Sequence, residues 1–433
     1  MKNYRFLVMI GMVALLGGSV YKTYDSRKTL NDNYESAIED ARENRKLGVW
    51  VNAEEDYLNA IDIKDNVDVR VELGEMYLAA GNKATAVKWG EKTVDLYPKE
   101  VSGYEFLIKA YLTDEDYAAC FETKEKVDAL KLSSKEINEM ISKIQYEYYL
   151  EHSYDDASIF SGGYCRVKYK DTYGFVNING DETTNTDFVE AGAFSEELAP
   201  VVDKDGNAYY IDTEGHKKKV IDFVDNVEKL GFIYDDIFPL YDGKDWTFYN
   251  LDGKKIAGGF DDVSSMGNGI AAVKEKDKWH LVDEKGKKVT DDEYDEIAMD
   301  EKGVVYRNDR IFAKAAGKYY LLDEKGKKVT DDTFEDARPF NGEGYAAVRI
   351  DGKWGFIDKD GKVVIKPEYV EARSFSNGFA AVRKASGWGF IDEDNDVVIE
   401  CKFDDAKDFN DHGCVFVAID DKWNYLLLYS QNH

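Results

Sequence analysis

The chain has 433 residues, 14% of them aromatic, and a formal net charge of −29. This length allows two or three domains with sizeable cores, and the aromatic content excludes a disordered chain. The charge excludes nucleic acid as a partner, because phosphate binding requires an excess of Lys and Arg. Residues 151–433 alone carry −22, so we expect the body of the protein to avoid anionic membrane surfaces.

The first residues have the pattern of an export signal. Lys2 and Arg5 precede an uncharged apolar stretch from Phe6 to Val20, as in the charged and apolar regions of such signals. The stretch is short for a membrane span, which needs about 20 residues, and no strong cleavage site follows it. We expect residues 1–29 to be an uncleaved signal anchor that holds the protein on the extracytoplasmic side of the cell membrane. A cleaved signal peptide, which would make the protein secreted, and a buried helix are the alternatives.

Residues 30–150 have the composition and period of helices. Apolar residues recur at intervals of three and four, as in Tyr77 and Met76, which lie three and four residues before Ala80, and this is the spacing of an amphipathic helix. The stretch Val67–Glu100 places small and aromatic residues at fixed offsets: Leu73, Gly74, Tyr77, Gly81, Ala86 and Pro98. These residues resemble a tetratricopeptide repeat, a helix pair that stacks on its neighbours into a curved array.

Two neighbouring stretches resemble this unit less closely. Val101–Ser134 keeps Tyr104, Leu107 and Tyr111 but lacks the turn glycine, and the second helix of a third unit is suggested by Trp50, Ala53, Tyr57 and Ala60. The stretch Ser133-Ser134-Lys135-Glu136 is predicted to cap a closing helix that runs to about Tyr149, which puts a domain boundary near Glu151. The resemblance implies a concave binding face, and the candidate binding residues on it are Asp68, Glu75, Glu105 and Lys109.

The rest of the chain, residues 151–433, repeats one unit, seen most clearly in Gly352–Arg383. Its apolar runs are rich in aromatic and β-branched residues and are bounded by turn residues, as in β-strands. Lys359-Asp360-Gly361 is predicted to be a hairpin turn whose last residue is left-handed. The same turn position is occupied in the other units by Gly180, Gly215, Gly253, Gly286, Gly326 and Asn395, and Asn is the other residue that tolerates this conformation.

Each unit has an equivalent position near the start of one strand, and seven of the eight are aromatic. These positions are Tyr173, Ala208, Trp246, Trp279, Tyr319, Trp354, Trp388 and Trp423, and their spacing varies from 33 to 40 residues. The array resembles the WG-repeat family over about residues 151–430, although the glycine of the motif remains only as Gly174, Gly355 and Gly389. WG repeats and tetratricopeptide-like arrays are both associated with interaction, so the resemblance implies a protein or peptide partner.

The array does not begin and end at the same point of the repeated unit. Tyr154–Phe160 matches the late segment Tyr369–Phe375, whereas the chain ends soon after an early segment at Trp423. Eight early and eight late segments can therefore close a propeller-like ring, in which the first late segment completes the last blade and leaves no exposed sheet edge. An open β-superhelix is the alternative. The predicted fold is thus an all-α helical-hairpin array followed by an all-β array of eight units.

Catalytic and metal-binding signatures are missing from the sequence. The five His and four Cys show no metal-ligand spacing, and no nucleophile elbow or phosphate-binding loop occurs. Asp392–Asp396 begins like a calcium loop, but Phe403 stands where the bidentate Glu is needed. We expect no cofactor, no metal and no enzymatic activity.

The repeat aromatics could form a stacking platform for sugars, but alternation makes both faces of the Trp354 strand apolar, as in a buried strand. We interpret them as core residues. The predicted function is therefore cell-surface binding or scaffolding through repeat arrays. A cell-wall carbohydrate-binding protein, or an enzyme whose site forms only on folding, is the alternative.

Overall fold

A computed structural model describes residues 28–185, 187–342 and 344–431. The chain divides into two compact units, the first ending at Glu147 and the second beginning at Tyr148. The predicted signal anchor, Phe6–Val20, lies outside the described residues. Within the described residues, no helix is both long enough and apolar enough to cross a membrane.

The first unit consists of helices joined by short turns. A helix covers residues 28–47 of the described chain, and the following helices are α2 (Trp50–Ile63), α3 (Val67–Ala79), α4 (Lys83–Leu96), α5 (Val101–Asp114), α6 (Tyr117–Ala129) and α7 (Lys135–Ser142). Side chains cap four of them by accepting a hydrogen bond from the backbone amide three residues on: Asn66, Asn82, Asp116 and Ser134. Such caps satisfy backbone donors that the first helical turn leaves free.

The helix pairs α3–α4 and α5–α6 are the two predicted tetratricopeptide-like units. Gly81 precedes the cap of α4 with φ 77°, and Glu115 takes the same left-handed conformation before the cap of α6, with φ 61°. The second unit therefore keeps the turn after losing the glycine. The first helices of the two units approach closely, because a Cβ atom at Gly74 would lie 2.2 Å from the ring of Phe106.

The closing helix is shorter than predicted. Ser134 does cap it, but α7 ends at Ser142 instead of running to about Tyr149. The residues Tyr148–Tyr154 form strand β1 instead, and this strand hydrogen-bonds with β30 (Lys422–Leu428) near the C-terminus. Long-range pairing overrides the local helical pattern here, and it starts the β unit three residues before the predicted boundary at Glu151.

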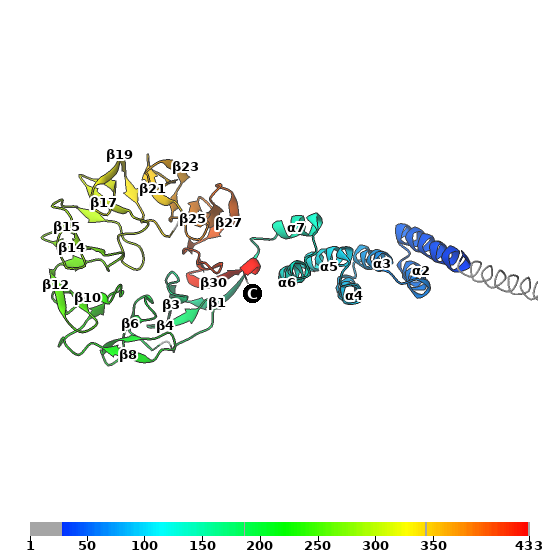
Figure 1. The fold of residues 1–433 in the computed structure, drawn as a ribbon, viewed down its shortest axis with the longest axis horizontal. Coiled ribbons are helices and arrows are strands. Elements are labelled where there is room, and N and C mark those ends of the chain that lie inside the picture. The colour runs from blue at the N-terminus through cyan, green and yellow to red at the C-terminus, as the bar shows by residue number, and fades with distance from the viewer. Residues whose placement is uncertain (1–27, 186, 343, 432–433) are drawn as a thin grey trace, which may run out of the picture. The chain divides into compact units, whose positions relative to one another are not determined.

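From Tyr148 onward, the described residues form eight antiparallel sheets that are the blades of a ring (Figure 1). Each blade begins with a two-residue strand, followed in chain order by two or three longer ones. The strands of blades 1–4 are β2 (Asp156–Ala157), β3 (Tyr164–Tyr169), β4 (Thr172–Asn177); β5 (Glu190–Ala191), β6 (Ala199–Val202), β7 (Ala208–Ile211), β8 (Lys217–Val220); β9 (Lys229–Leu230), β10 (Ile237–Tyr241), β11 (Trp246–Asn250), β12 (Lys255–Phe260); β13 (Asp262–Val263), β14 (Ile270–Glu275), β15 (Lys278–Asp283). The strands of blades 5–8 are β16 (Glu296–Ile297), β17 (Ile311–Ala315), β18 (Lys318–Leu322), β19 (Lys328–Phe334); β20 (Asp336–Ala337), β21 (Ala346–Ile350), β22 (Lys353–Ile357), β23 (Val363–Tyr369); β24 (Glu371–Ala372), β25 (Phe379–Lys384), β26 (Gly387–Asp392), β27 (Val397–Phe403); β28 (Asp405–Ala406), β29 (Cys414–Ile419), β30 and β1.

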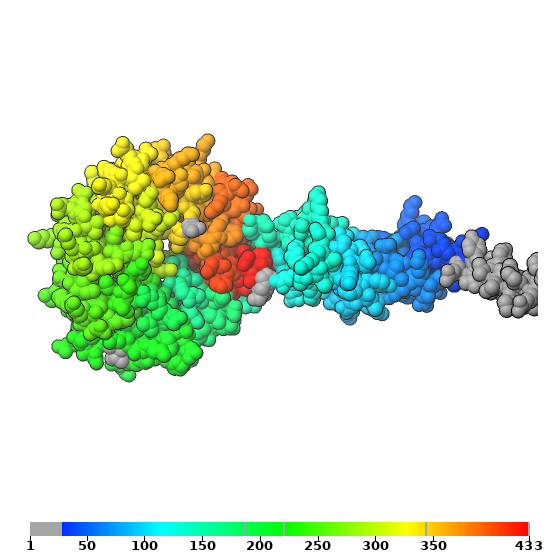
Figure 2. Space-filling model, viewed as in Figure 1, coloured from blue at the N-terminus to red at the C-terminus, as the bar shows by residue number. Residues whose placement is uncertain are grey.

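The ring is closed by its first strand. β1 is the outer strand of blade 8, and Tyr154 pairs with Trp423, so the first late segment completes the last early segment as predicted. Lys422 of blade 8 also forms an ion pair with Asp155 beside it. Figure 2 shows the red C-terminal residues against the teal residues that open the ring. The prediction of a closed ring is confirmed, and the open superhelix is wrong for this chain.

The hairpin turns that follow the third strand of the units keep the predicted backbone. All six glycines at this position, from Gly180 to Gly361, have φ between 72° and 87°. Asn395 replaces glycine in blade 7 and has φ 69°. In that turn, Asp392 Oδ1 accepts hydrogen bonds from the amides of Asp394 and Asp396. The stretch that begins like a calcium loop is therefore a hairpin turn.

Candidate functional site

The helical unit brings together two of its four candidate binding residues. Glu75 forms ion pairs with Lys109, at 2.9 Å, and with Arg45, at 3.1 Å. Burial alone would raise the pKa of Glu75, but the hydrogen bonds and charges of Lys109 and Arg45 outweigh it, and the pKa falls below its usual value. Glu105 lies apart and accepts a hydrogen bond from Ser134 Oγ at 2.5 Å. Asp68 is exposed in the first turn of α3. Three of the four candidates are thus already paired within the unit.

The seven repeat aromatics are packed into the blades. Trp279, Tyr319, Trp354 and Trp388 are buried, whereas Tyr173, Trp246 and Trp423 are half-buried. In blades 6–8, a cation directly after the two-residue strand lies over the indole ring. Arg338 lies 5.2 Å from the ring centre of Trp354, Arg373 lies 5.9 Å from Trp388, and Lys407 lies 4.8 Å from Trp423. Sugar stacking needs an exposed ring face, and these faces are covered by the chain's own cations.

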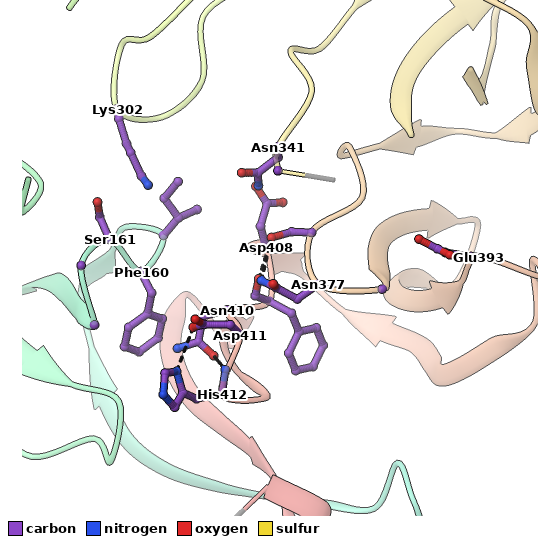
Figure 3. Close-up of a pocket in the computed structure, with 17 residues that line it drawn as sticks. Phe160, Ser161, Lys302, Asn341, Asn377, Glu393, Asp408, Asn410, Asp411 and His412 are labelled. Atoms are coloured by element: carbon purple, nitrogen blue, oxygen red, sulfur yellow. Dashed lines mark hydrogen bonds and ion pairs between the residues drawn. The ribbon is translucent and has the colours of Figure 1, made fainter. Parts of the chain in front are cut away.

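A polar hollow with a volume of about 740 Å³ lies where five blades of the ring meet (Figure 3). We call it the axial cavity. It is surrounded by blades 5, 6, 7, 8 and 1, at the connections between the two-residue strand and the next strand: Ile159–Gly163, Lys302, Asn341–Gly342, Ser376–Gly378 and Asp408–His412, with Glu393 at one margin. Its size falls in the range of small-ligand pockets.

Tight turns form two sides of the axial cavity. The amide of Tyr164 donates to the carbonyl of Ser161, and that of Phe379 donates to Ser376, which leaves two residues at each tip. These tips, Gly162-Gly163 and Asn377-Gly378, have φ between 53° and 80°, as left-handed turns in hairpins require. Each turn is also tied to the next blade, because Ser161 Oγ donates to Phe194 O at 2.6 Å and Ser376 Oγ donates to Phe409 O at 2.7 Å. The turn backbones are therefore held in place on both sides.

Blade 5 contributes a longer connection, residues 298–310, which we call the tongue. Its turn is organised by Asp300, whose carboxylate accepts from the amides of Lys302 and Val304 and from Arg307 Nε. The amide of Ser265 in blade 4 donates to Gly303 O at 2.7 Å. The tongue therefore has a defined backbone that places Lys302 at the axial cavity, where Figure 3 shows its side chain reaching inward.

Glu301 ties the tongue to the opposite blades. Its carboxylate pairs with Arg373 of blade 7 at 2.8 Å and with Lys407 of blade 8 at 3.0 Å. Burial would raise the pKa of Glu301, but the charges of Lys407 and Arg373 outweigh it and hold the pKa below its usual value. The ion pairs join residues 72 and 106 positions apart, so three blades meet at this carboxylate.

Asp408 is the buried acid of the cavity wall. Asn341 Nδ2 donates to its Oδ2 at 2.8 Å, while its Oδ1 is buried without a hydrogen bond to any described residue. Burial raises the pKa of Asp408 to about 6, and the Arg373 charge only partly offsets this rise. The pKa of neighbouring Glu301 moves in the opposite direction.

The sequence did not lead us to the tongue or to Asp408. The available signal was the repeat spacing, because the 40 residues from Trp279 to Tyr319 exceed every other spacing. That excess is the tongue. The paired cations Arg373 and Lys407 are common surface residues in sequence, and only the closed ring brings them to Glu301.

His280 and the cysteines, which could in principle react or bind a metal, are buried in the protein. The four cysteines, Cys120, Cys165, Cys401 and Cys414, are free. Burial raises the pKa of Cys165 to about 12, which disfavours the reactive thiolate. Across the described ranges, no group of three His, Cys, Asp or Glu side chains is arranged to hold a metal ion.

Comparison with known proteins identifies the repeats. The family model described as the WG containing repeat matches residues 173–207, 246–279, 321–354, 354–386 and 388–423, so the chain contains WG repeats. No curated protein matches the chain.

Among solved structures, BamB from Moraxella catarrhalis matches 65% of this chain and 99% of its own length, with 9% identity and a TM-score of 0.45. Sqt1 of Saccharomyces cerevisiae matches 65% of this chain and 97% of its own length, with 10% identity and a TM-score of 0.41. Hsv2p of Kluyveromyces lactis matches 57% of this chain and 96% of its own length, with 12% identity and a TM-score of 0.38. At these scores the likenesses carry no argument about function.

Proposed function

We propose that this chain, which carries WG repeats on a closed eight-bladed ring, is a non-enzymatic binding and scaffolding protein whose axial cavity receives part of a protein partner. The observation that carries the proposal is the convergence of polar groups from five blades on one hollow of about 740 Å³. A propeller-like ring is a rigid platform for interaction, and its loops are the natural place for recognition.

The construction of the cavity supports recognition better than catalysis. Its tight turns are locked to neighbouring blades by Ser161 and Ser376, and the tongue is locked by Glu301. Binding to prearranged groups avoids part of the entropy cost of ordering them. Catalysis by general acid and base needs a positioned pair of free groups, and the carboxylate of Glu301 is already engaged by Arg373 and Lys407.

We propose further that the protein acts at the cell surface. The support is the sequence pattern alone: Lys2 and Arg5 before the apolar stretch Phe6–Val20. Cell fractionation followed by N-terminal sequencing tests this. We expect the intact N-terminus in the membrane fraction, and a mature N-terminus near Val20 in the soluble fraction would contradict anchoring.

The binding proposal is tested by narrowing the cavity. His412 is an exposed residue at the cavity margin, and His216 is an exposed residue in a blade 2 turn away from it. Affinity capture with the full chain should retain the same specific proteins for the wild type and His216→Trp, whereas His412→Trp should lose them. Equal capture by both variants would place the interaction elsewhere on the molecule.

A further inference from the structure

We infer that the axial cavity is a binding site for a carboxylate group carried by a peptide, with Lys302 as the anchoring cation. The inference rests on the proposed function, because it names the chemistry by which the cavity recognises the partner.

Lys302 is the cation of the cavity wall. It is the one Lys or Arg around the cavity, and no carboxylate of the described residues lies within ion-pair distance of its ammonium group. Burial and then the charge of Arg307 lower the pKa of Lys302, and the charges of Asp300 and Asp408 only partly offset this effect, so the ammonium group is poorly stabilised where it stands. An anion at this position would restore the stabilisation that the ammonium group has lost.

None of the nearby described carboxylates forms an ion pair with Lys302, although Oδ1 of Asp408 has no hydrogen-bond partner among the described residues. Asp408 accepts from Asn341, Asp411 pairs with His412 at 2.8 Å, and Glu301 is bound to Arg373 and Lys407. Glu393, at the margin, stands apart from the other labelled side chains in Figure 3. A carboxylate from outside the protein can therefore approach Lys302 without displacing an ion pair among the described residues.

Neutral donors face the same hollow. The amides of Gly162, Gly163, Asn377 and Gly378 at the two turn tips make no hydrogen bond to other described residues. The amide nitrogen of Asn410, in the cavity wall, is buried and also finds no acceptor in the described chain. Unpaired donors beside one ammonium group suit an oxygen-rich anion.

The charge balance favours a carboxylate over a phosphate. A single Lys matches one negative charge, whereas a phosphate monoester carries between about one and a half and two at neutral pH. The second charge would face Asp408 and a ring region of net charge −22. Within a scaffold that binds a protein, a Glu or Asp side chain supplies the single charge.

The test uses calorimetry on the full chain with a capped pentapeptide that has one central glutamate between glycines. Its counterpart has glutamine at the centre. We expect the wild type to bind the glutamate peptide at least about tenfold more tightly than the glutamine peptide, the effect of one charge-assisted hydrogen bond. Lys302→Gln should remove this preference, Lys302→Arg should keep most of it, and Lys366→Gln, which changes an exposed lysine on β23, should leave it unchanged.

Results other than these contradict a specific claim: the carboxylate assignment, the peptide as its source, or the proposed function. Equal affinity for the two peptides, or an unchanged preference in Lys302→Gln, overturns the carboxylate assignment. Displacement of the peptide by inorganic phosphate but not by acetate at equal concentration does the same, and acetate as effective as the peptide overturns the peptide source. If His412→Trp weakens both peptides equally, the cavity still receives a partner and only the present inference fails. If His412→Trp leaves capture of protein partners intact, the proposed function fails as well.

Discussion

Blades 5 and 7 differ in the connection between the two-residue strand and the strand that follows it. In blade 7, residues 373–378 join β24 to β25 by a tight turn, whereas in blade 5 residues 298–310 form the tongue between β16 and β17. Both blades have buried repeat aromatics, Trp388 and Tyr319. The strands and their core are thus alike, and the difference is confined to the connection that reaches the axial cavity.

The two connections distinguish residues that stabilise the ring from those that we propose recognise a partner. The regular positions pack aromatic rings into the blades, with an Arg or Lys side chain over the ring in blades 6–8. The irregular tongue delivers Lys302 and Glu301 to the centre, where they meet groups from other blades. Changes at regular positions should therefore reduce stability, and changes at the tongue should mainly alter binding.

The largest effect is expected from removing the strand that closes the ring. Deleting Tyr148–Tyr154 exposes the edge of β30, where Tyr425, Leu426 and Leu427 are buried. We expect a loss of at least about 4–5 kcal/mol in the free energy of unfolding, with hydrogen-exchange protection lost first around Cys414–Tyr429. Loss confined to residues 163–180 would show that β1 supports only the adjacent blade.

A smaller loss is expected at a regular core position. Trp354→Ala removes a ring that is 4% exposed and should lower the free energy of unfolding by about 3–5 kcal/mol. Trp50→Ala is the control, because this indole is 36% exposed on α2, and it should cost under about 1 kcal/mol. Thermal and denaturant unfolding measure both. An unchanged midpoint for Trp354→Ala would contradict a core role for the repeat aromatics.

The buried acid of the cavity wall should have a pH-dependent effect. The pKa of Asp408 is about 6 in the folded protein and near 4 in an unfolded chain, so the protonated form favours folding. The wild type should lose stability relative to Asp408→Asn as the pH rises from 4 through 6, by up to about 3 kcal/mol at pH 7. Denaturant unfolding of both proteins at pH 4, 5, 6 and 7 measures this, and a constant difference would show that Asp408 does not titrate in this range.

Much of the ring could be predicted from the sequence, because each repeated unit needs the same residue types at its strands and turns. A left-handed turn position must be Gly or Asn, and the series from Gly180 to Asn395 has that backbone throughout. The frame of the repeat also predicted the pairing of Tyr154 with Trp423. The end of α7 was misjudged because Tyr148 and Tyr149 fit a helical pattern locally, while their partners lie near the C-terminus, at Leu428 and Leu427.

The candidate site was beyond the reach of pattern reasoning for a different physical reason. It depends on where the repeat departs from its rule, and on ion pairs such as Glu301 with Lys407 that join distant residues. Glu75 and Lys109, selected on the helical unit, do meet, but they neutralise each other. A charged residue in sequence carries no sign of whether its partner comes from the same chain.

The most direct test of the account is hydrogen exchange on the full chain with and without the glutamate peptide. Carboxylate binding in the axial cavity predicts slower exchange at Gly162, Gly163, Asn377 and Gly378, whose amides have no acceptor in the described structure, and in the tongue around Lys302. The helices α3 and α5 should be unchanged. Slower exchange on α3 and α5 with no change at the turn tips would contradict the account, because it would place recognition on the helical array instead of the ring.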